Sequence, residues 1–524
     1  MTHQFSQAPS VETPRSSFNR SSGHKTTMDF GYLVPIYWDT VMPGDTFSMN
    51  PAIFARLATP INPIMDNMFM DLHFFFVPYR QIWDNFRKFM GEQANPTDST
   101  DFTVPVSSAP VTTGYGEQSL QDYFGLVPGK ETYEHEVLNT RAYNHIYNEW
   151  YRDQNLIDSA VVDTDDGPDS PSNYVLRKRG KRHDYFTSCL PWLQKGDAVT
   201  LPLGLTAPVV ADVNNPVPEW ATQSIANTTL NTTLASQSVR YQGTIPASSE
   251  AFEFTDQTGL QVDLINATAA TWNELRIAAQ VQKLLERNAR GGTRYSEIVQ
   301  AHFNVNFLDV TYRPEFLGGT STRINIHPVP STVPLDAAAP ELTPQGKLAG
   351  YGTASMDGGG FTKSFTEHGT IIGILSARAD LTYQQGINRL WSRQTRYDFY
   401  WPVLAHLGEQ AVLNKEIYLQ GGLNSEIDNE VFGYQERWAE LRYRPSMITG
   451  RYRSSSEQSL DPWHLSQDFS SLPELNQTFI EENPPIDRVI AITTEPHLLV
   501  DCFFNLQCAR PMPLYSVPGL IDHF

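Results

Sequence analysis

The stretch HLLVDCFFNLQC near the end of the chain constrains the fold most, because it has an apolar side chain at every second position. Leu498, Val500, Cys502, Phe504, Leu506 and Cys508 share this alternation. A period of two over this length predicts a strand with one buried face, which another layer must cover. The runs GYLVPIYW, and FMDLHFFFV before Pro78, also read as strands. The core is therefore expected to be built from strands.

Further strands are predicted in TIIGILSARADLTY and IDRVIAIT, far apart along the chain. Helical spacing predicts only a few helices. The first covers 82–90 and stops at Gly91, and the second carries a stripe from Tyr143 to Tyr151 after a cap at Asn139 or Thr140. The third starts at a capping box of Thr271 and Glu274 and stops at Gly291–Gly292; its apolar stripe is Ile277, Val281, Leu284 and Leu285. So few helices argue against a repeating βα fold and favour an all-β core with long loops.

The 524 residues divide into four segments by composition. Residues 1–28 are polar and basic with single aromatics, typical of an N-terminal arm that orders only against something else. Residues 29–202 form the first part of the core, with helical insertions. Residues 203–266 are Ala, Val, Pro, Thr, Asn and Ser with almost no bases, which predicts a surface insertion. Residues 267–524 complete the core.

Charge limits the partners of the chain. Its 38 basic and 58 acidic residues give a net charge of -20, so the molecule as a whole repels nucleic acid. Any phosphate contact must be a local basic patch. The three cysteines are too few for a disulfide framework, and Cys502 and Cys508, on one strand, are ~20 Å apart. With no apolar signal region at the N-terminus, we expect folding in a reducing cytoplasm.

Two basic patterns are candidate DNA contacts. The cluster RKRGKR contains Arg177, Lys178, Arg179, Lys181 and Arg182; it is either a phosphate or subunit contact or a charged loop paired with the neighbouring aspartates. The stretch RYRPSMITGRYR is the second. If extended, it places Arg442, Arg444, Arg451 and Arg453 opposite Tyr443 and Tyr452. This pattern suits single-stranded DNA, with the arginines on phosphates and the tyrosines on bases or on protein; an edge strand with solvated arginines is the alternative.

No catalytic motif was found: GxxxxGK[ST], HExxH, CxxC and GxSxG are all absent from the sequence. The acidic residues Asp163, Asp165, Asp166 and Asp169 surround Gly167 and could hold Ca²⁺, but the ligand spacing fits poorly. A solvated acidic loop is the favoured interpretation. We therefore expect no enzyme activity, metal or cofactor.

Several blocks carry a resemblance to a known family. They include KTTMDFGYLVPIYWDTVMPGDTF, RLATPINPIMDNMFMDLHFFFVPYR, RAYNHIYNEWYRDQNL, TRYDFYWPVLAHLGEQAVLNKEIY, VFGYQERWAELRYRPS and CARPMPLYSVPGLIDHF. Together they closely resemble the major capsid proteins of microviruses, in particular the gokushovirus branch of small single-stranded DNA bacteriophages. The resemblance covers nearly the whole chain and fails only in two polar insertions.

The resemblance implies an eight-stranded viral jelly roll with very long insertion loops. It also implies a virion protein that forms a homo-oligomeric icosahedral shell, with pentamer and trimer contacts, around a circular single-stranded DNA genome. A small basic DNA-packaging protein, a pilot protein and a bacterial surface receptor are the implied partners. Residues 203–266 are the candidate for a protrusion at the three-fold axes used for host attachment, and the C-terminal block is expected at a subunit contact.

The alternative is a secreted carbohydrate-active β-protein, a glycanase or lectin, because an acidic, aromatic and Pro-rich composition also fits that class. The lack of a signal region and the expected reduced cysteines count against it.

Overall fold

The computed structural model describes residues 14–199, 272–306, 309–332 and 346–515, together with the backbone of short strands between 209 and 262. The chain divides into two compact units. The first comprises residues 1–193 and 293–524, and the second residues 194–292. No described helix is long and apolar enough to cross a membrane.

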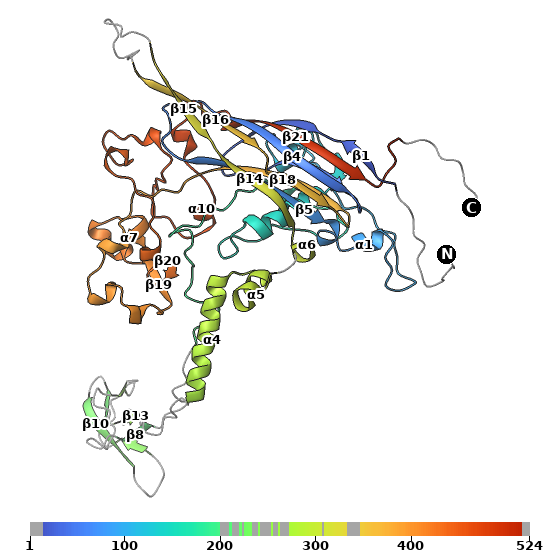
Figure 1. Ribbon diagram of the computed structural model, residues 1–524. Helices are drawn as coiled ribbons and strands as arrows, with labels where there is room; N and C mark the ends of the chain where they lie inside the picture. Colours follow the sequence, from blue (N-terminus) through green and yellow to red (C-terminus); the bar gives the residue numbers. More distant parts are fainter. Residues whose placement is uncertain are drawn as a thin grey trace. The chain divides into compact units, whose positions relative to one another are not determined.

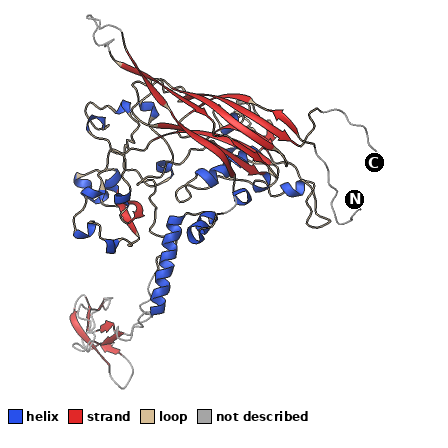
Figure 2. Cartoon of the chain, in the orientation of Figure 1, coloured by secondary structure: helices blue, strands red, loops and turns tan. Residues whose placement is uncertain are grey.

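Two antiparallel sheets form the centre of the first unit (Figures 1 and 2). One contains β2 (Ser22–Met28), β21 (Leu498–Arg510), β4 (Thr46–Leu57) and β16 (Leu348–Asp357), adjacent in that order. The other contains β3 (Val34–Val41), β18 (Gly369–Ala379), β5 (Met68–Pro78) and β14 (Glu315–Arg323). Numbered along the chain, these eight strands have the orders 1-8-3-6 and 2-7-4-5. This is the jelly-roll arrangement of two Greek keys, which confirms the predicted fold class.

Shorter strands widen the first sheet. They are β1 (Ser16–Asn19), β15 (Asn325–Pro330) and β17 (Phe361–Ser364). In the part of the chain that the structure describes, no backbone ladder joins the two main sheets, so the core is a sandwich open along its edges.

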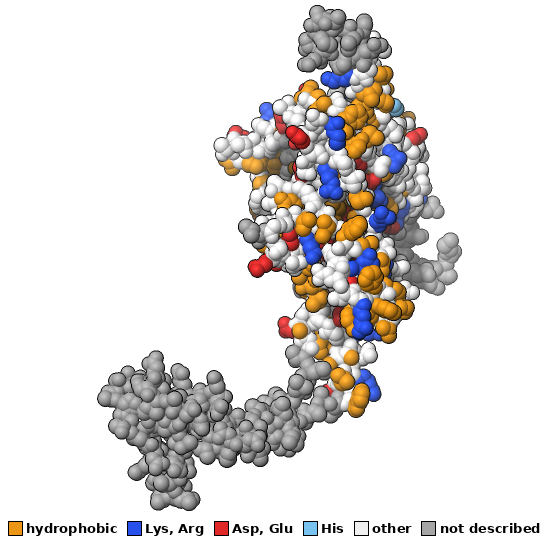
Figure 3. All heavy atoms as spheres, turned by 90° about the vertical axis from the view of Figure 1, so that its left-hand side faces the viewer, with side chains coloured by type: hydrophobic (Ala, Val, Ile, Leu, Met, Phe, Trp, Pro, Cys, Tyr) orange, Lys and Arg blue, Asp and Glu red, His pale blue; other side chains and the backbone are white. Residues whose placement is uncertain are grey.

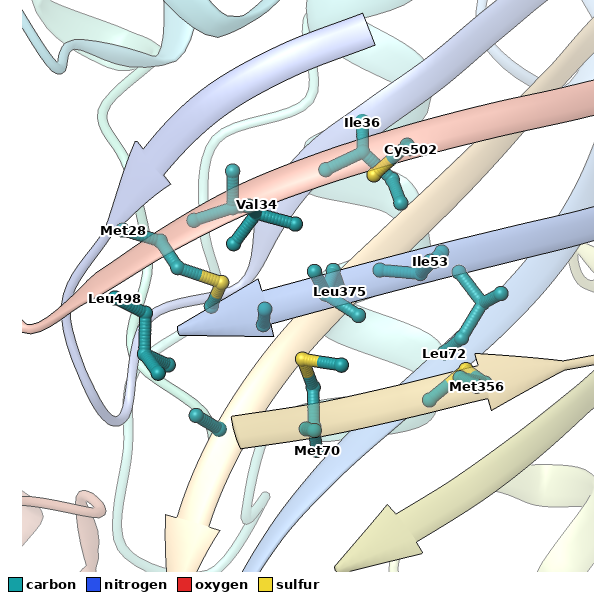
Figure 4. Close-up of a cluster of buried hydrophobic side chains, with 14 of the residues drawn as sticks. Met28, Val34, Ile36, Ile53, Met70, Leu72, Met356, Leu375, Leu498 and Cys502 are labelled. Carbon is teal, nitrogen blue, oxygen red and sulfur yellow. The ribbon is translucent and has the colours of Figure 1, made fainter. Parts of the chain in front are cut away.

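The core between the sheets follows from the alternation of β4 and β21. Each strand buries every second side chain, and the buried set of β21 includes Cys502 and Cys508, both free thiols, as predicted. Figure 4 shows Leu498 and Cys502 of β21 in one buried cluster with Val34 and Ile36 of β3. Phe504 reaches the ring of Tyr37 with 4.9 Å between centroids. Burial of these apolar faces holds the two sheets together.

β18 is buried along its whole length because its other face is also covered. Helix α3 (Leu138–Ile146) packs there, and Ile372 and Ile374 of β18 join a second core with Tyr143 and Ile146 of the helix. A strand covered on both faces loses the alternation and reads as a continuous apolar run, as TIIGIL does.

Two predicted helices are shorter or start elsewhere. α3 begins at Leu138, after Val137, and continues as a π-helical turn over Tyr147–Tyr151, so the predicted cap at Asn139 or Thr140 is wrong. The helix predicted over 82–90 is only α1 (Phe86–Phe89) after a 3₁₀ turn at Tyr79–Gln81. Trp83 and Asn85 both donate to Asp166, which holds this segment as a turn. The predicted stop at Gly91 agrees with its φ of 102°.

The strand predicted in IDRVIAIT is wrong. Ile486–Arg488 form a 3₁₀ turn, and only Ile490 makes an isolated bridge, to Pro60. The buried residues Ile486, Val489 and Ile490 are three and four positions apart, which is helical spacing.

Part of the predicted N-terminal arm is ordered. β1 and β2 lie within residues 16–28 and both pair with β21, His24 opposite Cys502. Segments from the two ends of the chain therefore complete one edge of the sheet.

Long insertions separate β5 from β14 and β18 from β21. The described elements of the first insertion that belong to the first unit, besides those above, are α2 (Leu120–Tyr123), β6 (Val106–Ser108), β7 (Glu134–Glu136), α5 (Tyr295–Phe303), α6 (Asp309–Tyr312) and the 3₁₀ turn Pro171–Asn173. The second, residues 380–497, contains the hairpin β19 (Glu409–Leu413)–β20 (Val431–Glu436) and α7 (Asn414–Ile417), α8 (Ser425–Asp428), α9 (Ala439–Arg442) and α10 (Gln477–Ile480). A third hydrophobic core, with Phe186 and Phe432, stabilises this insertion.

The second unit contains the helix that was predicted after residue 270. α4 (Trp272–Gly291) ends at the predicted glycines, and Gly292 has a φ of 110°. Thr271, half of the predicted capping box, lies outside the described residues. The short strands of this unit are β8 (Val209–Ala211), β9 (Glu219–Thr222), β10 (Ile225–Thr232), β11 (Val239–Tyr241), β12 (Glu253–Phe254) and β13 (Leu260–Val262).

Candidate nucleic-acid interface

A cleft of about 730 Å³ opens in the insertion of residues 380–497. One wall is the segment from Tyr383 to Arg393, and the other runs from Leu441 to Ile448. Tyr185 and Phe186 also line it. Its volume lies in the range of small-molecule sites in proteins.

Local hydrogen bonds position the two walls. The 3₁₀ turn Arg389–Trp391 is capped by Asn388, whose side chain accepts from the amide of Leu390 at 2.9 Å. An isolated bridge joins Tyr383 to Met447. Arg453 donates to the carbonyl of Gln384 at 3.0 Å, which connects the second RYR triplet to the first wall.

The structure brings four of the six residues of the RYR triplets to this cleft: Arg442, Tyr443, Arg444 and Arg453. The predicted extended segment is wrong, because Arg442 ends helix α9 and Arg451 lies in the 3₁₀ turn Gly450–Tyr452. The alternation of faces therefore does not hold.

The arginines of the triplets differ in how much of their charge is already paired. Arg442 forms an ion pair with Glu436, and Arg451 donates to the side-chain oxygen of Gln458 at 2.8 Å. For Arg444, which is exposed, the structure gives neither an ion pair nor a hydrogen bond among the described residues. Arg444 is thus the cation of the cleft that is most available to an anion.

The two tyrosines also differ. Tyr443 is exposed at the cleft, whereas Tyr452 packs 5.7 Å from the ring of His464 and donates its hydroxyl to Met65 Sδ at 3.3 Å. Tyr452 is therefore a packing residue of the insertion.

A buried carboxylate lies at the base of the cleft. Glu416 accepts hydrogen bonds from Tyr185 Oη and Arg389 Nη1, each at 2.8 Å. Burial raises the pKa of Glu416. The positive charge of Arg389 and these hydrogen bonds lower the pKa by a smaller amount, so it lies above its usual value. Arg389 is also 4.0 Å from Glu440. Both glutamates are thus occupied with protein partners.

Among the lining residues of the cleft that sequence reasoning missed are Arg389, Trp391 and Arg393. They lie in RLWSRQTRYDFYW, residues 389–401, where arginine and aromatic residues are interleaved as in the RYR triplets. The same pattern could have pointed to this segment.

The second basic cluster is mostly built into the fold. Arg179 pairs with Asp71 at 2.7 Å, and Lys181 is buried and donates to the carbonyl of Phe479 at 2.6 Å. Burial lowers the pKa of Lys181 to about 8. Lys178 donates to Asn483 at 2.9 Å, while Arg182 is exposed. Arg177 lies over the ring of Tyr147, with 5.7 Å from its guanidinium carbon to the ring centroid.

The neighbouring aspartates have other partners. The buried Asp169 pairs with the equally buried Arg141 of α3 at 2.5 Å, and Asp166 accepts from Trp83 at 2.7 Å. The predicted solvated acidic loop is thus partly a buried ion pair. Across the described ranges, no group of three or more His, Cys, Asp or Glu side chains is arranged to hold a metal ion.

Comparison with known proteins agrees with the fold. The model of the capsid protein (F protein) family matches residues 6–520. The chain is similar to capsid protein VP1 of Bdellovibrio phage phiMH2K, with 48% identity over 100% of this chain and 98% of the relative. Capsid protein VP1 of Chlamydia phage 1 is 42% identical, covering 99% and 98%, and that of Spiroplasma virus 4 is 37% identical, covering 99% and 97%.

These matches confirm the resemblance to gokushovirus capsid proteins and exclude the alternative of a secreted carbohydrate-active protein. Since they extend over nearly the whole length of a chain that folds as a jelly roll, the chain belongs to the capsid protein (F protein) family and is a structural, non-enzymatic capsid protein of the virion.

Proposed function

We propose that the protein forms a small icosahedral shell around a circular single-stranded DNA genome. A set of unburied apolar side chains in one stretch of the insertion carries this proposal: Tyr397, Phe399, Tyr400, Trp401, Val403 and Leu407. Exposed apolar patches of this kind are typical of protein interfaces. Aromatic residues are also enriched there. Neighbouring subunits at pentamer and trimer contacts would bury them.

The genome contact is proposed at the arginine-lined cleft. Arg442 and Arg444, which line the cleft, would contact phosphates. Arg451 and Arg453 of the second RYR triplet and the exposed Arg182 of the cluster RKRGKR are the further proposed contacts. Because the chain carries a net charge of -20, a small basic packaging protein would supply the remaining counter-charge. A pilot protein is the other proposed internal partner, and assembly would take place in the host cytoplasm.

Residues 203–266 are proposed as the protrusion that meets a receptor on the bacterial surface. Their composition has few charges, so a cluster of three copies would help them to bury apolar surface. The C-terminal segment is proposed at a subunit contact. Met512, Leu514 and Tyr515, its last described large apolar residues, are exposed.

The test is co-expression with the basic partner, followed by electron microscopy and measurement of nuclease-protected DNA. We expect closed particles that contain single-stranded DNA. Replacing Arg442, Arg444, Arg451 and Arg453 together by glutamine should leave shells intact and lower their DNA content. Stable monomers alone, or wild-type particles without DNA, would contradict the proposal.

A further inference from the structure

We propose that the cleft between residues 383–393 and 441–448 is a nucleotide pocket, in which one base of single-stranded DNA stacks on Trp391 and Tyr443 while its phosphates meet arginine. This inference rests on the proposed function, in which the shell encloses single-stranded DNA. It goes further by naming the pocket, the aromatic residues and the part of the nucleotide that each side chain recognises.

The first observation is local charge. Five arginines and two glutamates line the cleft, although the whole chain has a net charge of -20. Glu416 is buried and already accepts from Tyr185 and Arg389, and Glu440 accepts from Gln410 at 2.6 Å. The charge left for a ligand is therefore positive, and its complement is an anion.

The second observation is the exposure of two aromatic side chains, one on each wall. Trp391 is 85% exposed and Tyr443 is 54% exposed, both within the lining of this cleft. Flat, accessible aromatic faces beside cations are the means by which proteins hold single-stranded nucleic acid without sequence preference. An anion that also carries an aromatic ring satisfies both features.

The third observation is an adjoining polar cleft of about 480 Å³, which shares Arg389, Arg393 and Glu440 with the first. Lys415 and Arg437 also line it. A phosphodiester that continues out of the apolar cleft would meet these two cationic side chains.

Figure 3 shows the side of the molecule that carries this insertion, with Lys and Arg side chains interspersed among hydrophobic ones. An acidic peptide could also match cations beside apolar walls. The two aromatic faces favour a nucleobase, so the nucleotide is the occupant that we propose and the peptide is an outcome of the test.

The main experiment measures binding of a fluorescein-labelled oligothymidine to the full-length unassembled chain by anisotropy, over a salt titration. Trp391→Leu and Tyr443→Leu should each raise Kd by roughly 5- to 150-fold, the range that corresponds to the stacking of one base, with the salt dependence unchanged. Arg444→Gln should instead reduce the slope of log K against log salt by about 0.7, the value for one phosphate contact.

Controls separate the base from the phosphate and the cleft from the rest of the surface. An abasic oligonucleotide should bind wild type and Trp391→Leu equally. Arg56→Gln and Tyr515→Leu change an exposed arginine and an exposed tyrosine outside the cleft lining and should leave Kd within twofold. Circular dichroism checks that every variant is folded.

Intact particles give the independent readout. Ultraviolet cross-linking of packaged DNA, followed by mass spectrometry, should place thymine adducts on peptides that contain Trp391 or Tyr443. Particles that hold DNA but give adducts only elsewhere, with Kd unchanged in the cleft variants, would overturn the pocket and leave the proposed function standing. Particles without DNA would overturn the proposed function itself. If a chain ending at Tyr515 bound DNA more tightly than wild type, the cleft would be assigned to the C-terminal segment.

Discussion

At the scale of single residues, Asp71 of β5 connects segments that are distant in sequence. Its carboxylate accepts from Ser321 of β14 at 2.5 Å, Arg179 at 2.7 Å and Arg378 of β18 at 2.9 Å. Asp71 is buried, so these partners compensate for the loss of water around its charge. One carboxylate therefore links β5, β14 and β18 of the second sheet to the basic cluster of residues 177–182.

This arrangement predicts a pH dependence. Burial raises the pKa of Asp71. The hydrogen bond from Ser321 and the guanidinium groups of Arg179 and Arg378 lower the pKa by a larger amount, to about 2. Because the folded pKa is depressed, the stabilisation is complete above the unfolded pKa of about 3.9 and is lost as pH falls towards about 2. Its size is on the order of 2 kcal/mol.

The measurement is the free energy of unfolding of the unassembled chain against pH. In Asp71→Asn, the part of the pH dependence between about pH 4 and 2 should disappear, and stability at neutral pH should fall. Asp501→Asn is a matched control, because Asp501 pairs with Lys25 on the surface, where an ion pair contributes little. Parallel curves for wild type and Asp71→Asn would refute the assignment.

At the scale of the element, the two faces of β21 contribute differently to the free energy of unfolding. Phe504 is 1% exposed and contacts Tyr37 across the sandwich, whereas the adjacent Phe503 is 52% exposed on the outer face. Both residues are phenylalanines of β21, so a comparison of their substitutions isolates the contribution of burial to stability.

Phe504→Ala should destabilise the unassembled chain by about 3–5 kcal/mol, because it removes a buried ring and leaves a cavity. Phe503→Ala should cost less than about 1 kcal/mol, since its ring is already half in water. Urea unfolding of the two variants gives the comparison. Equal losses would mean that the outer face of β21 is covered in the unassembled subunit.

At the scale of the whole molecule, the segment of residues 397–407 leaves apolar side chains unburied on the subunit. Val403 lies in the 3₁₀ turn Pro402–Leu404 and is 89% exposed. A side chain with so few neighbours contributes little to folding of the subunit, so a change there separates assembly from stability.

Val403→Glu should leave unfolding of the subunit within about 0.5 kcal/mol of wild type. It should lower the yield of shells at least about tenfold, because a carboxylate buried without a partner costs roughly 3 kcal/mol or more at each contact. Sedimentation and microscopy provide the yield. Val111→Glu, at a 72% exposed site outside this segment, is the control. Normal assembly of Val403→Glu would place the subunit contact elsewhere.

Much of the candidate site could be anticipated, but its geometry could not. Arginine beside aromatic residues predicted DNA contacts at residues 442–444, and the structure places these residues in one cleft with Trp391. The sequence could not tell that Tyr452 packs against His464, because that contact depends on a turn instead of the expected strand. The DNA contact itself remains a prediction.

The sequence by itself determined four strands of the sandwich, β3, β5, β18 and β21, and the family. Alternation marks β21, a continuous apolar run marks β18, and similarity over the whole chain identifies a capsid protein. Only the tertiary structure decided which charges are free, because ion pairs form between segments that a local pattern cannot relate. Arg179 is 108 residues from its partner Asp71, whereas Arg444, equally basic in sequence, is left exposed without an ion pair among the described residues.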